Sequence, residues 1–489
     1  MIRESELLEK YPAEVSVPAS LVAAKVAAAN RVLIVLDDDP TGTQSVAGLP
    51  VLTRWDVEDF DWVFGYRIDG TVAKAVYVLT NTRSLDPAEA RVRNREIVVN
   101  ALTAAGKAGI TVGFTSRSDS TLRGHFPLEP ETIAGTLLTE SSTTVDGVVI
   151  VPAFPDAGRI TIGGVHYTRG VEGTLIPVAE TEFAKDASFG FANSSLAAYV
   201  EEKSDGRIPA SSVITIDLGL IRRGTPKAGA AAVADAIDGA SDSTPIVVDA
   251  VTENDLRVLA LGLEEAEHRG KTLIYRVGPP FVRARIGQEI REPLATAEIF
   301  HAGRTVAAGT ARGGLIVVGS HVGVTTRQLK VLTDAHASAS IVEIDVEKLL
   351  SDDGAAHVSE VVATIVAALA NRDVIIHTSR LLIKTDDAAA SLKIARTVSA
   401  AVVEVVNRTL KATPPRFVIA KGGITSSDVA AHGLEIRHAI VRGPMLPGIV
   451  SLWEPVDGPA EGIPYIVFAG NVGDDQSLAD VTRKLSNTF

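Results

Sequence analysis

Short apolar runs alternate with segments of helical character along most of the chain, and this alternation limits the folds that it can adopt. In the first half these runs are 31–36, 75–79, 110–114, 148–151, 213–216 and 245–250. Strands that are separated by helices pair in parallel, through right-handed crossovers. We therefore predict an α/β fold with two domains, each a mostly parallel sheet flanked by helices.

Two of the runs lead into loops rich in charged and hydroxyl side chains, Asp37–Gln44 and Arg117–His125. Ligands of an open α/β sheet bind at the carboxyl ends of its strands. A guanidinium fork suits a carboxylate or a phosphate, and Ser and Thr suit hydroxyl groups. The adjacent carboxylates Asp37, Asp38 and Asp39 repel one another unless a cation or a substrate hydroxyl lies among them. Solvated loops with an Arg–Asp pair and a helix-capping Asp are the structural alternative.

Arg83 occupies a comparable place, because it follows the run 75–79 and precedes a helix. Asp86 and Pro87 predict the start of that helix, which we expect to reach Asn100. A surface arginine is the alternative for Arg83. The polar quartet 252–255 follows another strand and is predicted to cap a helix.

The second half repeats one arrangement, in which an apolar strand runs into a glycine turn and then into a helix. The strands are 315–318, 416–420 and 465–469, with helices expected from Thr325, near Ser427 and from Asp474. Glycines let backbone N–H groups approach a ligand, and helix N-termini favour anions. Three such turns predict phosphate binding in this half of the chain.

The amino-acid composition limits the kinds of molecule that the protein can bind. A formal net charge of −13 argues against nucleic acid and anionic membrane, so an anionic substrate would need locally clustered arginines. The absence of cysteine excludes disulfides, a thiol nucleophile and thiolate zinc sites, and fits a cytoplasmic enzyme. Residues 1–30 are charged and lack the apolar core of a signal peptide, and no run reaches the roughly 18 apolar residues of a membrane span. A homodimer is the commonest assembly for such a chain.

The length of 489 residues predicts two domains. From Pro279 to Gly314 the chain becomes polar and rich in Pro and Gly, which is typical of a domain junction. We therefore expect an N-terminal extension at 1–30, a first domain at 31–280, a linker at 281–312 and a second domain at 313–489.

Three motifs, in order along the chain, resemble those of the four-carbon acid sugar kinases. Residues 38–42 match an Asp-Asp-x-Thr-Gly loop after the first strand, and residues 119–124 match Asp-Ser-Thr-Leu-Arg-Gly in full. Residues 152–155, with Gly158 and Arg159, are the third match. The resemblance covers nearly the whole chain from about Arg31. It implies a sugar-acid-binding first domain and a nucleotide-binding second domain.

The resemblance also implies an activity: ATP- and Mg²⁺-dependent phosphorylation of the terminal hydroxyl of threonate, erythronate or a 3-oxo-tetronate. Asp39 is then the candidate that orients or deprotonates the attacking hydroxyl, with Asp38 and Asp119 as its neighbours. The expected substrate-binding residues are Arg123, Arg117, Ser120, Thr121, Arg83 and Arg159. The residues expected to bind ATP are Ser320, Gly422, Gly423, Ile424, Thr425, Gly470 and Gly473. No metal ligands are assigned.

The chain departs from the family pattern at several of these places. Arg117 stands where Lys is usual, His125 where Asn is common, and Thr43 where Ala is commoner. Ile424 replaces an Asp, which weakens a side-chain role there and leaves the backbone role intact. Because the first three departures touch the expected substrate pocket, the identity and stereochemistry of the acid stay open.

Two other functions share some of these features. Asp37, Asp39 and Thr41 after an apolar strand also resemble a haloacid-dehalogenase-type phosphatase, in which the first Asp attacks phosphorus and Gly473-Asp474-Asp475 could serve as a later magnesium motif. That interpretation gives residues 119–124 and the other glycine turns no role. A non-catalytic sugar-acid sensor would share every loop but would not need a nucleotide site.

Overall fold

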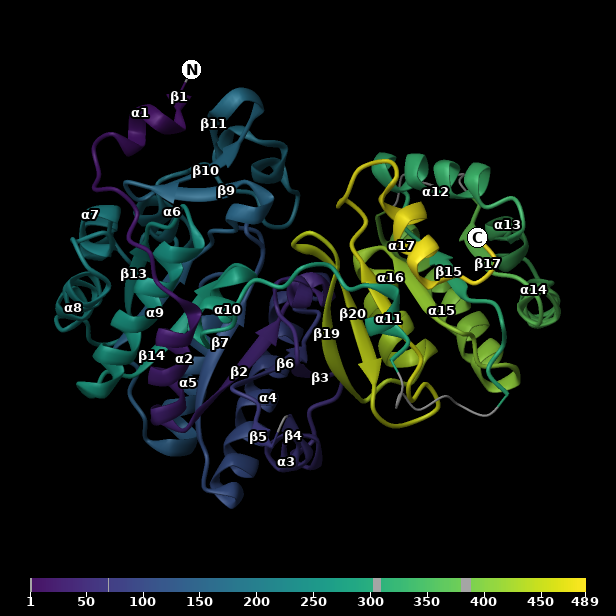
Figure 1. The fold of residues 1–489 in the computed structure, drawn as a ribbon, viewed down its shortest axis with the longest axis horizontal. Coiled ribbons are helices and arrows are strands. Elements are labelled where there is room, and N and C mark those ends of the chain that lie inside the picture. The colour runs from purple at the N-terminus through teal and green to yellow at the C-terminus, as the bar shows by residue number, and fades with distance from the viewer. Residues whose placement is uncertain (1, 69, 302–308, 380–387) are drawn as a thin grey trace. The chain divides into compact units, whose positions relative to one another are not determined.

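The computed structural model describes residues 2–68, 70–301, 309–379 and 388–489, apart from the side chains of residues 68 and 388–393. The chain forms two compact units, Met1–Leu49 with Trp55–Ile290 and Pro50–Arg54 with Arg291–Phe489 (Figure 1). The division after Ile290 falls inside the segment expected as a linker, of which residues 302–308 lie outside the described residues. Each unit contains a mostly parallel sheet with helices, which confirms the predicted fold class.

The main sheet of the first unit has the strand order β12-β13-β8-β14-β7-β2-β6, and the neighbouring strands of this order pair in parallel. Its strands are β2 (Arg31–Asp37), β6 (Ala75–Leu79), β7 (Thr111–Arg117), β8 (Gly147–Val151), β12 (Ile214–Ile216), β13 (Thr244–Val248) and β14 (Leu273–Val277). Their Val, Leu and Ile side chains are nearly all buried, as expected for a parallel sheet that is covered on both faces.

Two sets of helices cover this sheet (Figure 1). α4 (Pro87–Ala108) and α5 (Leu128–Ser141) pack together, as do α8 (Pro226–Ile237) and α9 (Glu253–His268). The connections through α4 and α5 run along the sheet in one direction, and those through α8 and α9 run in the other. Since such crossovers are right-handed, the two pairs lie on opposite faces.

The first thirty residues belong to the first unit. They form β1 (Ile2–Arg3), α1 (Glu4–Leu8) and α2 (Ala19–Ala29), and α2 packs on α9. β1 is one edge of a small antiparallel sheet of order β1-β11-β10-β9, with β9 at Arg159–Ile162, β10 at Val165–Arg169 and β11 at Thr174–Pro177. The remaining helices of the unit are α3 (Val57–Gly65), α6 (Leu196–Lys203), α7 (Leu218–Ile221) and α10 (Pro280–Arg285).

The sheet of the second unit has the order β3-β19-β20-β21-β18-β15-β17-β16. β15 (Leu315–Val318), β16 (Ser340–Ile344), β17 (Val374–Thr378), β18 (Val418–Lys421) and β21 (Tyr465–Phe468) are parallel, whereas β19 (His438–Leu446) and β20 (Ile449–Pro455) form an antiparallel hairpin. β3 (Leu49–Leu52) is distant in sequence, yet Thr53 N donates to Arg437 O at 3.2 Å. The helices are α11 (Thr296–Ile299), α12 (Gly323–Ala335), α13 (Val346–Leu349), α14 (Gly354–Leu369), α15 (Ala388–Ala412), α16 (Gly423–Asp428) and α17 (Ser477–Leu485).

Several predicted boundaries were wrong. α12 begins at Gly323 rather than Thr325, and α16 begins at Gly423 rather than near Ser427. β7 continues past Phe114 to Arg117, because Thr115, Ser116 and Arg117 are buried and pair with β2 and β14. α4 continues past Asn100 to Ala108 through an alanine-rich stretch and ends at Gly109, whose φ is +66°. α17 begins at Ser477 rather than Asp474, whose side chain accepts from Ser477 Oγ. The predicted caps at Asp86 and at Thr252 are confirmed.

Candidate active site

The loops after β2 and β7 meet at a point where the direction of the chain connections changes. β2 and β7 are neighbours in the sheet, yet the chain leaves β2 toward β6 and leaves β7 toward β8, on the opposite side. Such a switch point opens a crevice at the carboxyl ends of the strands, where α/β proteins bind ligands. The loops Asp38–Gln44 and Ser118–His125 both start here. The sequence had placed Asp37 and Arg117 in these loops, but they are the last residues of β2 and β7.

Asp37 and Asp38 share the guanidinium of Arg117. Arg117 Nε pairs with Asp37 Oδ1, and Arg117 Nη2 lies 3.1 Å from Asp38 Oδ1. Burial raises the pKa of both carboxyls, that of Asp37 to about 8, and the guanidiniums nearby oppose the shift. All three side chains are at most 2% exposed, so these two carboxylates hold the strand ends together rather than face solvent.

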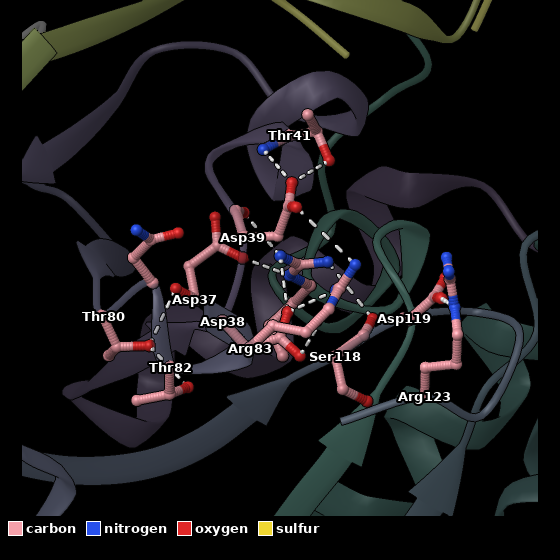
Figure 2. A network of polar contacts seen from close by, with 12 residues as sticks. Asp37, Asp38, Asp39, Thr41, Thr80, Thr82, Arg83, Ser118, Asp119 and Arg123 are labelled. Atoms are coloured by element: carbon pink, nitrogen blue, oxygen red, sulfur yellow. Dashed lines mark hydrogen bonds and ion pairs between the residues drawn. The ribbon is translucent and has the colours of Figure 1, made fainter. Parts of the chain in front are cut away.

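Asp39 is more accessible, with 21% of its side chain exposed. It caps the short 3₁₀ helix Pro40–Ser45, and its Oδ1 accepts from Thr41 N at 3.0 Å and from Thr41 Oγ1 at 2.5 Å. Arg83 lies between Asp38, at 2.6 Å, and Asp39, at 3.6 Å. Burial opposes ionisation of Asp39, but Arg83, Arg117 and the Thr41 bonds outweigh it and lower the pKa of that carboxyl. Asp39 is therefore an ionised acceptor at the edge of the network (Figure 2).

Asp119 organises the loop after β7 (Figure 2). Its carboxylate accepts from Thr121 N at 3.2 Å, from Thr121 Oγ1 at 2.5 Å and from Arg123 Nε at 2.6 Å. Burial opposes ionisation, but Arg83, Arg123 and these bonds lower the pKa of Asp119. The Arg123 guanidinium also lies over the Phe183 ring, 5.3 Å from its centroid, and 3.6 Å from Asp186. The guanidinium of Arg123 is thus held at one edge by Asp119 and on one face by Phe183.

Arg159 lies close to Arg123. Its guanidinium lies over the Phe183 ring at 5.7 Å, so Arg123 and Arg159 both contact Phe183. Arg159 Nη1 donates to Ala157 O at 2.5 Å, and its buried Nε has no hydrogen-bond partner among the described residues. Ser120 and Thr121 are buried, and the Thr121 hydroxyl is already held by Asp119. Of the expected substrate residues, Arg123, Arg159 and Arg83 are therefore better placed than these two hydroxyls to meet a ligand.

Sequence reasoning missed a buried pair that supports this network. Glu129 at the start of α5 accepts from Arg276 Nη1 and Thr82 Oγ1, at 2.5 and 2.6 Å. Arg276 is 5% exposed although it lies within the apolar strand β14. The sequence did contain a signal for this pair, namely an arginine inside an apolar strand. The missed contact of Phe183 with two arginines had no signal in the sequence.

In the second unit, the turns after β15, β18 and β21 lie against one another. A Cβ on Gly319 would collide with Thr425 Oγ1, and one on Gly470 would lie 2.7 Å from Ser320 Oγ. Gly422, with a φ of +132°, approaches Ser320 Cβ. β15 and β18 are neighbours whose connections leave in opposite directions, so this is a second switch point. Gly473 packs instead against Ser477.

Not every backbone donor in these turns is free for a phosphate. Gly319 N and Ser320 N donate to Lys421 O at 3.2 and 3.3 Å, and Gly422 N donates to Phe468 O at 2.8 Å. The first turn of α16, Gly423 to Thr425, carries the N–H groups that a helix start leaves without intrahelical acceptors. The glycine cradle and these donors fit a phosphate group. The Ile424 side chain is 59% exposed and, being apolar, offers a phosphate no hydrogen-bond donor.

No cluster of three or more His, Cys, Asp or Glu side chains that could hold a metal ion occurs among the described residues. The carboxylates at the first switch point are instead paired with arginines. A protein cage for Mg²⁺ therefore does not fit the described part of the chain. Within that part, no helix is long and apolar enough to cross a bilayer.

Comparison with known proteins identifies the family. Residues 33–285 match the family model described as a sugar-binding N-terminal domain, and residues 315–478 match a nucleotide-binding C-terminal domain. The chain belongs to the four-carbon acid sugar kinase family. It is 26% identical over 326 residues to a D-erythronate kinase of Heliobacterium modesticaldum, covering 65% of this chain and 64% of that protein. It is 29% identical over 263 residues to a D-threonate kinase of Salmonella typhimurium, covering 54% and 53%. Each match spans less than two thirds of the relative's length.

Solved structures agree on the fold. A Salmonella typhimurium LT2 structure described as a tRNA synthase aligns with a TM-score of 0.65 at 18% identity, covering 93% of this chain and all of that one. A Haemophilus influenzae protein from a family described only as a domain of unknown function aligns with a TM-score of 0.57 at 18% identity, covering 92% and 99%. At these identities the likeness shows the fold alone. The family assignment rests on the two domain matches.

Proposed function

We propose that this protein is an ATP-dependent kinase that phosphorylates the terminal hydroxyl of a four-carbon sugar acid: threonate, erythronate or a 3-oxo-tetronate. The observation that carries the proposal is the first switch point. There an accessible ionised carboxylate, Asp39, and an oriented guanidinium, Arg123, follow adjacent strands. A sugar acid offers a hydroxyl for the carboxylate and a carboxylate for the guanidinium.

The roles follow from the contacts. Arg123 binds the substrate carboxylate, and Arg159 and Arg83 add positive charge beside it. Asp39 accepts the proton of the attacking hydroxyl or orients that hydroxyl, while Asp38 and Asp119 keep Arg83 and Arg123 in place. Phosphoryl transfer needs little covalent chemistry from the protein beyond positioning and charge neutralisation.

The nucleotide is assigned to the second unit. The cradle formed by Gly319, Gly422 and Gly470 and the first turn of α16 suit its phosphates, with Ser320 and Thr425 as side chains alongside. When bound, Mg²⁺ supplies neutralisation of the phosphate charge. Because the described residues offer it no cage, its ligands would be mostly phosphate oxygens and water.

The test is ADP formation from ATP with purified full-length protein, over D- and L-threonate, D- and L-erythronate and 3-oxo-tetronates. We expect turnover with at least one acid and little with a neutral tetritol, since the tetritol lacks the carboxylate for Arg123. Acid binding without any turnover would indicate a sensor instead.

The phosphatase alternative is tested in the same preparation. It requires Asp37 to attack phosphorus, but Asp37 is buried and held by Arg117. We therefore expect no phosphate release from sugar phosphates without nucleotide and no phosphorylated Asp37 by mass spectrometry. Either observation would contradict the kinase proposal.

A further inference from the structure

Lys421 is the last residue of β18 and directly precedes the Gly422-Gly423 turn. Its side chain is fully buried. The amine Nζ donates to Ala469 O at 2.6 Å, has a longer contact of 3.5 Å to Val472 O, and lies 3.9 Å from the centroid of the Phe468 ring. Its contacts are thus main-chain carbonyls and an aromatic face, all from the end of β21 and the turn that follows.

The backbone of the same residue contacts the third turn. Lys421 O accepts from Gly319 N and from Ser320 N, at 3.2 and 3.3 Å. One residue therefore joins the turns after β15, β18 and β21, which are the turns assigned to the nucleotide phosphates. A change in the Lys421 side chain would act on two of these turns at once.

The charge of Lys421 has no carboxylate partner among the residues that the structure describes. The acidic groups on the neighbouring elements are engaged elsewhere. Asp428 of α16 accepts from Ser399 Oγ at 2.6 Å, Asp474 accepts from Ser477 Oγ at 2.7 Å, and Asp475 pairs with Arg327 at 2.8 Å. The titratable group in the turn after β15 is His321, whose Nε2 lies 3.1 Å from Thr378 Oγ1. A buried cation without a counter-ion is unfavourable.

We propose that Lys421 is a positioning residue of the nucleotide site: its amine holds the turns after β18 and β21 together, and the phosphates of the bound nucleotide balance its charge. This inference rests on the proposed function, because it requires a nucleotide in the second unit. The ligand that it favours is a nucleoside di- or triphosphate. In the ligand-free protein a protonated Lys421 amine lacks a counter-ion among the described residues, and an anionic ligand supplies one.

The first test is Lys421→Met, which keeps the length of the side chain and removes its charge. We expect the Kd for ADP to rise at least about tenfold, as for loss of an interaction with a charged group. We expect an unchanged KM for the sugar acid, and a ligand-free Tm that does not fall, because an unpaired buried charge has been removed. If Lys421 had a purely structural role, Lys421→Met would instead have a lower Tm without ADP and an unchanged Kd for ADP. That result would overturn the inference.

Lys484→Met is the matched control. Lys484 Nζ also donates to a main-chain carbonyl of the second unit, Met445 O at 2.8 Å. Lys484 lies on α17, and among the described residues its amine contacts Met445 O and Leu294 O rather than the turns. Lys484→Met loses the same kind of hydrogen bond as Lys421→Met. The Kd of Lys484→Met for ADP should nevertheless equal that of the parent protein. An equal loss of ADP affinity in both variants would also overturn the inference.

A second measurement is made on the parent protein, with Lys421→Met as its control. Burial lowers the pKa of Lys421 to about 7, so the amine of the ligand-free protein is mostly neutral at pH 8. Phosphates are already ionised there and would raise that pKa, so ADP binding should take up a proton. Calorimetric titration with ADP at pH 8 in two buffers of different protonation heat measures this uptake, which Lys421→Met should lack.

The outcomes separate the two proposals. Binding of ADP without proton uptake, together with an unaffected Kd in Lys421→Met, overturns the role of Lys421 and leaves the nucleotide assignment standing. No ADP binding by the parent protein overturns the nucleotide assignment, and the role of Lys421 with it.

Discussion

At the residue scale, the three consecutive carboxylates differ in what they can reach. Asp37 and Asp38 are 2% and 1% exposed and are held by arginines, whereas Asp39 is 21% exposed. We expect Asp39→Asn to lower kcat by roughly 10²–10⁴-fold, the usual effect of losing a positioned base. The Kd for ADP should not change. Steady-state kinetics and calorimetry measure both quantities.

Asp61→Asn is the control for Asp39→Asn. Asp61 is exposed on α3 and pairs only loosely with Lys107, at 3.4 Å, so its loss should leave kcat unchanged. If Asp39→Asn keeps more than about a tenth of the parent kcat, Asp39 is not the base.

Arg123 tests recognition of the acid. Its Nε is bound to Asp119 and its face lies on Phe183, so a ligand would meet the Nη groups, of which Nη1 lies 3.6 Å from Asp186. Arg123→Lys keeps the charge and loses the fork geometry of the guanidinium. Loss of one charge-assisted bond should raise the KM for the acid roughly 10–150-fold and leave the KM for ATP nearly unchanged.

Arg207→Lys is the control for Arg123→Lys, because Arg207 is an exposed arginine of the same unit that pairs with Glu131 at 2.8 Å. If Arg123→Lys raises the KM for ATP and not that for the acid, Arg123 binds phosphate and the proposed role is wrong. The disadvantage of a neutral tetritol relative to the acid should shrink in Arg123→Lys.

At the scale of elements, the sequence located the strands and caps well, since both depend on local patterns. Asp86 caps α4 as predicted, accepting from Ala88 N at 2.8 Å and Glu89 N at 2.9 Å. We expect Asp86→Ala to cost about 0.5–2 kcal/mol of stability, or roughly 1–8 °C in Tm, by thermal unfolding. Asp86→Asn can still cap and should recover most of the loss. If Asp86→Ala leaves Tm unchanged, the cap does not stabilise α4.

What the sequence did not predict depends on strand order. Asp37 and Arg117 are far apart in the chain and pair because β2 and β7 are neighbours in the sheet. β15 and β18 are likewise neighbours, which brings Ser320 to Gly422. Apolar runs indicate where strands lie but not which strands are adjacent. The resemblance to a family pointed to the loops after β2 and β7, and the order of the strands explains why these loops meet.

At the scale of the whole molecule, the acid and the nucleotide are assigned to different units of the chain. Binding of the two ligands should therefore be separable by mutation. Gly470→Ala places a Cβ 2.7 Å from Ser320 Oγ and displaces that hydroxyl. We expect it to weaken ADP binding about tenfold, as for the loss of roughly one good hydrogen bond. Binding of the sugar acid should be unchanged, whereas Arg123→Lys should show the opposite pattern.

Gly106→Ala completes this comparison. Gly106 lies within α4 of the first unit, and a Cβ there would meet no atom within 4 Å, so neither ligand should be affected. Calorimetric titration of the full-length protein with ADP and with the acid, each alone, gives both affinities for every variant. Gly470→Ala could instead weaken binding of the acid and leave ADP binding unchanged, while Arg123→Lys weakens ADP binding and leaves acid binding unchanged. In that case the two units have been assigned the wrong ligands.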